Sequence, residues 1–219
     1  MHEGPESGAF ADRDSSAPAD VCEAVGVRRA VPFLAAAALV AVLVVGLIQA
    51  GGEETDDGKT GPTLTEAQQA LADAPPPLAA LYKRGNVIEP SGTDDFKGEL
   101  RALRGHPVVV NAWASWCGPC KLEFPFFQRA AVRLGKDTAF LGLNVEDNRE
   151  SAEKFLREKP VPYPSLEDDG AILREAAPGT RGLPVTIFYD KDGKRKFVHQ
   201  GGYRSEADLV EDIERYTGA

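Results

Sequence analysis

The amino-acid sequence predicts an α/β domain, a central mixed β-sheet flanked by helices, attached to a single N-terminal transmembrane helix. Three observations lead to this fold class. Residues 30–50 carry no charge and are long enough to cross a bilayer as a helix. Residues 108–113 have the pattern of a buried strand and run into two cysteines, then into a segment with helical spacing. Residues 185–201 alternate around Asp192–Gly193, which is a strong hairpin signal, and a helical pattern follows.

The N-terminal third of the chain is predicted to be a membrane anchor with polar flanks. Residues 1–29 are rich in small and polar residues, so we expect a disordered cytoplasmic segment. Residues 30–50 form a transmembrane signal anchor, and the two arginines before it place the N-terminus in the cytoplasm. Residues 51–77 form a flexible extracytoplasmic linker, in which residues 63–74 have the pattern of a short helix. The soluble domain then covers residues 78–219.

Three other interpretations of the apolar segment fit less well. A cleaved signal peptide has a short basic region and small residues at positions −3 and −1, whereas here Ile48 precedes Ala50 after a long polar start. The residues after the paired arginines match a twin-arginine export signal only weakly. A buried core helix would need apolar neighbours, which these polar flanks do not supply.

Within the soluble domain, helical and strand-like patterns alternate. A short extended piece lies around residues 86–89, and a helix at 94–104 follows with Asp94 as its cap. Ser205 caps the last helix. The expected strands are 108–113, 138–145, 185–189 and 194–201, and the other expected helices are 118–134, 150–159, 170–177 and 206–216. A crossover helix between 108–113 and 138–145 requires these two strands to be parallel.

The composition excludes two classes of binding site. The chain has 25 basic and 34 acidic residues, a net charge of −9, and its longest basic run is Lys194–Lys196, so we expect no nucleic-acid partner. None of the three histidines has a metal-ligand spacing with Cys117 and Cys120, so we expect no metal site and no cofactor. The third cysteine, Cys22, is separated from this pair by the predicted membrane segment. The pair is therefore predicted to serve redox chemistry.

The position of the cysteine pair at the start of a helix explains why it suits thiol–disulfide exchange. The free N–H groups and positive dipole end of the helix favour a thiolate at Cys117. Cys120 lies one turn further on, close enough to attack a mixed disulfide held at Cys117. Pro119 suits the first turn, where its missing N–H has no cost.

Residues 116–120, Trp-Cys-Gly-Pro-Cys, resemble the thioredoxin active site letter for letter. The longer run VVVNAWASWCGPCKLEFP at 108–125, with GLPVTIF at 182–188, is similar to the membrane-anchored TlpA/ResA/CcmG branch of the thioredoxin superfamily. The resemblance implies a thioredoxin-like fold over residues 78–219 and a redox-active disulfide between Cys117 and Cys120. It also implies that Pro184 is cis and faces this pair, and that a substrate chain binds along Trp116, Gly118, Pro119, Leu183 and Pro184.

The same resemblance implies a role for Glu123, which matches a glutamate beneath the cysteines that influences their ionisation and proton transfer. On a helix Glu123 lies one turn from Cys120, so the two can be close. The alternative is an exposed first-turn glutamate that interacts only with the helix dipole. Asn111 departs from thioredoxin, which has a buried aspartate there. Because asparagine cannot take a proton, the acceptor must be Glu123 or water.

These observations predict an extracytoplasmic protein-disulfide reductase. The resemblance implies apocytochrome c, during cytochrome c maturation, as a substrate, and a membrane electron donor of the CcdA/DsbD kind. Two alternatives stay open. One is an oxidase that forms disulfides in exported proteins, although Gly118–Pro119 matches reducing thioredoxin. The other is a redox-inert module that binds peptides.

Overall fold

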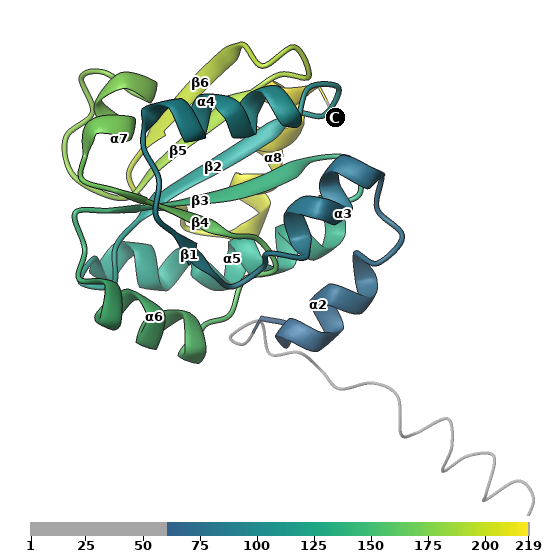
Figure 1. Cartoon of the computed structure of the whole chain (residues 1–219), viewed down its shortest axis with the longest axis horizontal. Coiled ribbons are helices and arrows are strands. Elements are labelled where there is room, and N and C mark those ends of the chain that lie inside the picture. Colours follow the sequence, from purple (N-terminus) through teal and green to yellow (C-terminus); the bar gives the residue numbers. More distant parts are fainter. Residues whose placement is uncertain (1–60, 219) are drawn as a thin grey trace, which may run out of the picture. The chain divides into compact units, whose positions relative to one another are not determined.

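The strand pattern at residues 108–113 forms β2 (Val108–Trp113), in which every residue is buried. The computed structural model describes residues 61–218 and contains five further strands: β1 (Ile88–Glu89), β3 (Ala139–Val145), β4 (Ser165–Asp168), β5 (Val185–Tyr189) and β6 (Arg195–Gln200). They form one sheet in the order β1-β4-β3-β2-β5-β6 (Figure 1). The four strands from β1 to β2 run parallel, and β5 is antiparallel to both β2 and β6. The predicted mixed sheet is confirmed.

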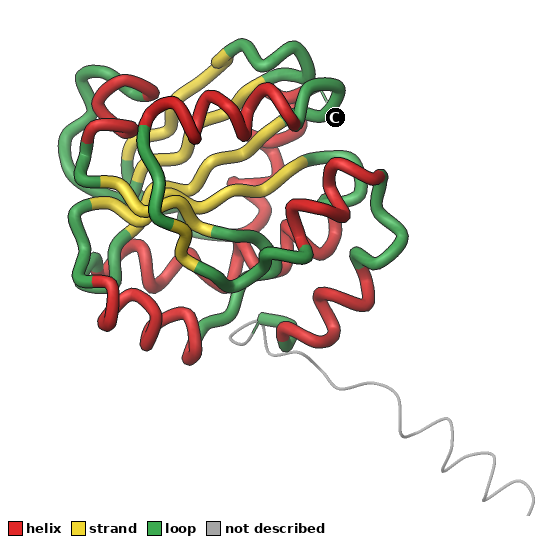
Figure 2. Tube along the Cα trace, viewed as in Figure 1, coloured by secondary structure: helices red, strands yellow, loops and turns green. Residues whose placement is uncertain are grey.

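Helices cover both faces of this sheet (Figure 2). They are α2 (Leu64–Ala70), α3 (Pro76–Tyr82), α4 (Thr93–Ala102), α5 (Gly118–Leu134), α6 (Arg149–Glu158), α7 (Ala171–Ala176) and α8 (Glu206–Thr217). On one face, Trp113 of β2 contacts Phe124 of α5 and Phe155 of α6. On the other face, Tyr189 of β5 contacts Phe96 of α4. The crossover through α5 joins the parallel strands β2 and β3, as their sequence pattern requires.

Trp113 connects the layers near the end of β2. Its ring is fully buried, and its edge-to-face contact with Phe124 has a centroid distance of 5.0 Å. The indole Nε1–H donates to the hydroxyl of Ser165 on β4, at 3.1 Å, so the buried polar edge of the ring is satisfied. Gly142 on β3 lies between them, because a Cβ there would approach the Ser165 Oγ to 2.1 Å. A side chain at residue 142 therefore has no room.

Most predicted elements are observed within a residue or two of their expected bounds, but two differences are informative. The strand β4 was not predicted, because its four residues, Ser-Leu-Glu-Asp, have no apolar run and follow three prolines. It forms through parallel pairing with β3. The predicted cap of α4 was wrong: the helix begins at Thr93, and the Asp95 carboxylate accepts from the Gly92 N–H.

The packed region begins earlier than predicted. Within the predicted linker, residues 64–70 form α2, as the helical pattern at 63–74 predicted, and Thr63 and Glu66 form a reciprocal capping box. The helix α3 begins at Pro76, in the last two residues of that linker. Ala67, Leu71 and Ala74 are buried, so this part of the predicted linker is corrected to packed helical structure. The apolar side chains of residues 63–74 are few and short, so the sequence pattern did not indicate that this helix packs on the domain. Between residues 61 and 218 no helix is long and apolar enough to cross a bilayer. The predicted segments 1–29 and 30–50 lie outside the described residues.

We predict that Gly142→Ala destabilises the fold. The new methyl group would collide with Ser165 and displace the partner of the Trp113 indole, at a cost of ~1–3 kcal/mol typical of overpacking. Thermal unfolding measures this loss. Gly98→Ala, inside α4 where the added Cβ meets only an ordinary contact, is the control and should gain about 0.5–1 kcal/mol. An unchanged melting temperature for Gly142→Ala would contradict this packing.

Candidate active site

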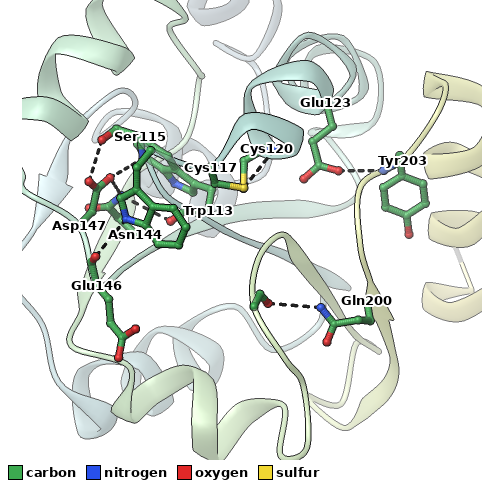
Figure 3. Close-up of a disulfide and its surroundings, with 12 residues drawn as sticks. Trp113, Ser115, Cys117, Cys120, Glu123, Asn144, Glu146, Asp147, Gln200 and Tyr203 are labelled. Atoms are coloured by element: carbon green, nitrogen blue, oxygen red, sulfur yellow. Dashed lines mark hydrogen bonds between the residues drawn. A yellow bond between two sulfur atoms is a disulfide. The ribbon is translucent and has the colours of Figure 1, made fainter.

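Cys117 and Cys120 lie at the start of α5, directly after the loop that leaves β2. They are joined by a disulfide, and both are buried (Figure 3). Cys117 is the N-cap residue, and its Sγ accepts a hydrogen bond from the Cys120 N–H at 3.2 Å. The structure thus places Cys117 where the free N–H groups of a helix stabilise negative charge on sulfur.

A carboxylate from the neighbouring strand holds the loop before the cysteines. The Asp147 side chain, just after β3, accepts from the Ser115 N–H and, at 2.7 Å, from the Ser115 hydroxyl (Figure 3). It also accepts from the Asn144 amide and from the Asn148 N–H. Asp147 was not predicted from the sequence. Its position directly after a parallel strand was the available signal, since the carboxyl ends of β2 and β3 meet at one edge.

Trp116 lies at the surface beside the disulfide. Its side chain is 60% exposed, and its Nε1–H donates to the Glu146 carbonyl oxygen at 3.1 Å, which fixes the ring. A cavity of about 400 Å³ adjoins the ring. Its lining includes Trp116, Val145, Leu173, Ala177, Pro178 and Leu183. Gly118 and Pro119, in the first turn of α5, are also exposed.

The segment before β5 completes the surface around the cysteines. The Leu183–Pro184 peptide bond is cis, as the resemblance implied. Val185 pairs with Ala112 near the end of β2, so Pro184 lies at the same edge of the sheet as the loop to Cys117. The Pro184 carbonyl oxygen accepts from the Gly201 N–H, which ties this segment to the chain after β6.

Glu123 is fully buried one turn beyond Cys120, and not an exposed first-turn residue. Its Oε2 accepts from the Tyr203 N–H at 3.0 Å, while Oε1 has no hydrogen-bond partner among residues 61–218 (Figure 3). Burial raises the pKa of Glu123 to about 8, and the hydrogen bond from Tyr203 opposes this shift only in part. A carboxyl group in this state exchanges protons in the pH range of a thiol.

The structure also reveals site residues that the sequence did not indicate. Gln200 is the last residue of β6 and Tyr203 lies three residues further on, and neither belongs to the cysteine motif or to the segment around Pro184. The Gln200 side chain donates a hydrogen bond to the Gly182 carbonyl oxygen. The Tyr203 backbone N–H donates to the Glu123 carboxylate. Within the described part of the chain, no group of three or more His, Cys, Asp or Glu side chains is placed to hold a metal ion.

Comparison with known proteins gives consistent matches over this domain. Residues 89–197 match the AhpC/TSA family. The chain is 29% identical to the thiol:disulfide interchange protein DsbE of Yersinia pestis, over 74% of this chain and 77% of that protein. It is 28% identical to the thiol-disulfide oxidoreductase ResA of Halalkalibacterium halodurans, over 55% of this chain and 69% of that one. A solved structure of dsbF from MTB is 26% identical, covers 53% of this chain and 85% of its own, and has a TM-score of 0.48.

We predict that Glu123 makes the stability of the oxidised protein fall as pH rises. A carboxyl whose pKa is raised by folding contributes most to stability at pH values below the pKa that it has in the unfolded chain. The free energy of unfolding should therefore decrease by up to ~1.4 kcal/mol per pH unit. The decrease should extend from about pH 4.5 to about pH 8. Urea unfolding across this range measures the slope, and Glu123→Gln should remove it.

Glu150→Gln is the matched control, because it deletes a solvent-exposed carboxylate at the start of α6. It should keep the wild-type slope. If the slope also persists in Glu123→Gln, Glu123 titrates in its ordinary range and the buried-acid account of the site is wrong.

Proposed function

Because the chain belongs to the thioredoxin superfamily, in its TlpA/ResA/CcmG type, we propose that it reduces disulfides of partner proteins through Cys117 and Cys120. The similarity to proteins named as thiol:disulfide interchange proteins supports a thiol–disulfide oxidoreductase. The observation that carries the proposal is the Cys117–Cys120 disulfide at the N-terminus of α5, with the buried carboxyl of Glu123 one turn away.

The reaction proceeds in two exchanges. The reduced protein attacks with the Cys117 thiolate, forms a mixed disulfide with one sulfur of the partner, and releases the other sulfur as a thiolate. Cys120 then loses its proton and attacks the Cys117 sulfur. This closes the Cys117–Cys120 disulfide and releases the second partner sulfur as a thiolate. Two electrons pass to the partner, whose two thiolates take up protons.

Glu123 is the proposed acceptor of the Cys120 proton. Cys120 is fully buried, so its proton cannot pass directly to bulk water. A carboxylate with a pKa of about 8 matches a thiol near 8.5, and transfer between groups of similar pKa is close to neutral in energy. The free Oε1 supplies the lone pair.

Partner chains are proposed to bind across the exposed ring of Trp116, the turn at Gly118–Pro119, and Leu183–Pro184. The cavity beside Trp116 and Leu183 combines apolar side chains with the charged Glu146 and Arg174, and it is open to a side chain beside the partner cysteine. In this proposal the backbone around Pro184 aligns the partner in an extended form. Binding one partner sulfur next to Cys117 raises its effective concentration for the first exchange.

The cellular setting is also part of the proposal. Residues 30–50 anchor the protein, and the catalytic domain lies outside the cytoplasm. Apocytochrome c is the proposed substrate in cytochrome c maturation, since its paired thiols must be reduced before haem attachment. A membrane thiol-transfer protein of the CcdA/DsbD kind would return electrons to Cys117 and Cys120.

The oxidase alternative depends on which redox form the site stabilises. Strong oxidants are strong because their reduced form is stabilised. Here a buried carboxyl lies one turn from Cys120, and its ionised form would disfavour a second buried negative charge. This arrangement supports a reductase, as does the Gly118–Pro119 pair. A redox-inert peptide-binding module would have no use for a disulfide placed at a helix N-terminus.

We predict that Cys117→Ser abolishes reduction of insulin or of a model disulfide, because the attacking sulfur is lost. Cys120→Ser should instead accumulate mixed disulfides, since the first exchange proceeds and the second cannot. Turnover assays and non-reducing electrophoresis measure these outcomes. Cys22→Ser is the control and should react as wild type. Turnover by Cys117→Ser, or no trapped partner with Cys120→Ser, would contradict the proposed order of attack.

A further inference from the structure

The end of β6 and the connection to α8 contact both the segment around Pro184 and Glu123 of α5. We call residues Gln200–Tyr203 the strap. The Gln200 side chain accepts from the Arg181 N–H at 2.8 Å and donates to the Gly182 carbonyl at 3.3 Å (Figure 3). The Gly201 N–H donates to the Pro184 carbonyl at 2.9 Å. These contacts fix the segment that leads into the cis-proline.

The second half of the strap lies over α5. A Cβ at Gly202 would be 3.6 Å from Pro119 Cβ and 3.7 Å from Glu123 Oε2, so the backbone here lies directly against the helix. The Tyr203 N–H then donates to Glu123. The backbone of the strap thereby covers the Glu123 carboxyl and connects it to Pro184, which immediately precedes β5.

Tyr203 is held from both neighbouring elements. Its hydroxyl donates to Asp212 of α8 at 2.8 Å, and its ring stacks on His199 of β6 with centroids 4.1 Å apart. His199 Nδ1 lies 3.5 Å from the same Asp212 oxygen. The rings of Tyr203 and of Phe127 on α5 pack in a T-shaped arrangement with centroids 6.4 Å apart. Tyr203 is only 7% exposed, so the strap has a rigid end beside Glu123.

We propose that Tyr203, locked by Asp212 and His199, is a positioning residue that keeps Glu123 dry and oriented, and that the strap couples this carboxyl to the partner-binding segment at Pro184. The inference rests on the proposed function, in which Glu123 accepts the Cys120 proton. Tyr203 touches neither sulfur nor partner and acts only through Glu123.

The charged and titratable groups around the site define the expected direction. In the oxidised protein, Tyr203 on the strap and Tyr163 before β4 are groups among residues 61–218 that interact electrostatically with Glu123. Tyr203 in turn interacts with Asp212, which His199 faces, and with Tyr216. Burial is the main cause of the raised pKa of Glu123, ahead of the opposing hydrogen bond. We expect a loosened strap to admit water to Glu123, and because burial is the larger of the two causes, the pKa of Glu123 should then fall.

The test compares Tyr203→Phe and Asp212→Ala with wild type in the full chain. Both variants break the Tyr203–Asp212 bond without altering a cysteine or Glu123. Two readouts are measured: the pH dependence of mixed-disulfide resolution, and the titration of the Glu123 carboxyl carbon by NMR in the oxidised protein. In both variants we expect two midpoints to move about one pH unit lower: the midpoint of the rise in the resolution rate with pH, and the midpoint of the Glu123 titration. This shift is equivalent to about a tenfold change in proton affinity.

Glu214→Ala is the matched control for Asp212→Ala. It removes an exposed carboxylate from the same helix, and Glu214 is not one of the groups that interact with Tyr203. It should leave both readouts unchanged. If the NMR titration of Glu123 is the same in wild type, Tyr203→Phe and Asp212→Ala, the positioning role is overturned even where disulfide exchange is normal. If instead wild type shows no disulfide exchange, the proposed function fails, while the NMR titration still decides the role of Tyr203.

Discussion

The register of β2 with its two neighbours is the constraint on which the site depends. Pairing with β3 on one side and β5 on the other brings three distant segments to one edge of the sheet. These are the cysteine loop after β2, Asp147 after β3 and Pro184 before β5. A one-residue slip of β2 would turn Trp113 away from Phe124 and Phe155 and move the cysteines to the other face. Core packing and active-site geometry are therefore fixed by the same interactions.

A buried carboxyl one turn from the buried disulfide is unfavourable in the folded state, because burial penalises its charged form. Glu123 has a single hydrogen bond, from Tyr203, and its second oxygen is unpaired among the described residues. The resulting high pKa lets one carboxyl hold and release a proton at neutral pH. The free energy of unfolding is thus lower at the pH where Glu123 can transfer protons. Functional sites commonly lower stability in this way.

The sequence predicted the parts of the site that local chemistry determines. The residues of β2, α5 and the β5–β6 hairpin carry strong patterns, and Cys117 and Cys120 follow from their place at a helix start. The cis form of Pro184 came from the family resemblance alone, because trans is favoured for most X–Pro bonds. Three features were missed because each depends on tertiary contacts. The strand β4 forms by pairing with β3, and Asp147 contributes by binding the Ser115 loop. Tyr203 acts through its backbone N–H, a group that almost any residue carries.

The direction of electron flow is the central claim, and the reduction potential of the Cys117–Cys120 pair tests it most directly. Equilibration of the purified protein with glutathione or dithiothreitol buffers gives this value. A protein-disulfide reductase of this kind should have a potential near or below that of thioredoxin, about −270 mV, which would make the dithiol an electron donor. A potential near that of the strong oxidants, about −120 mV, would contradict this direction of electron flow, because the pair would then donate its disulfide to partners.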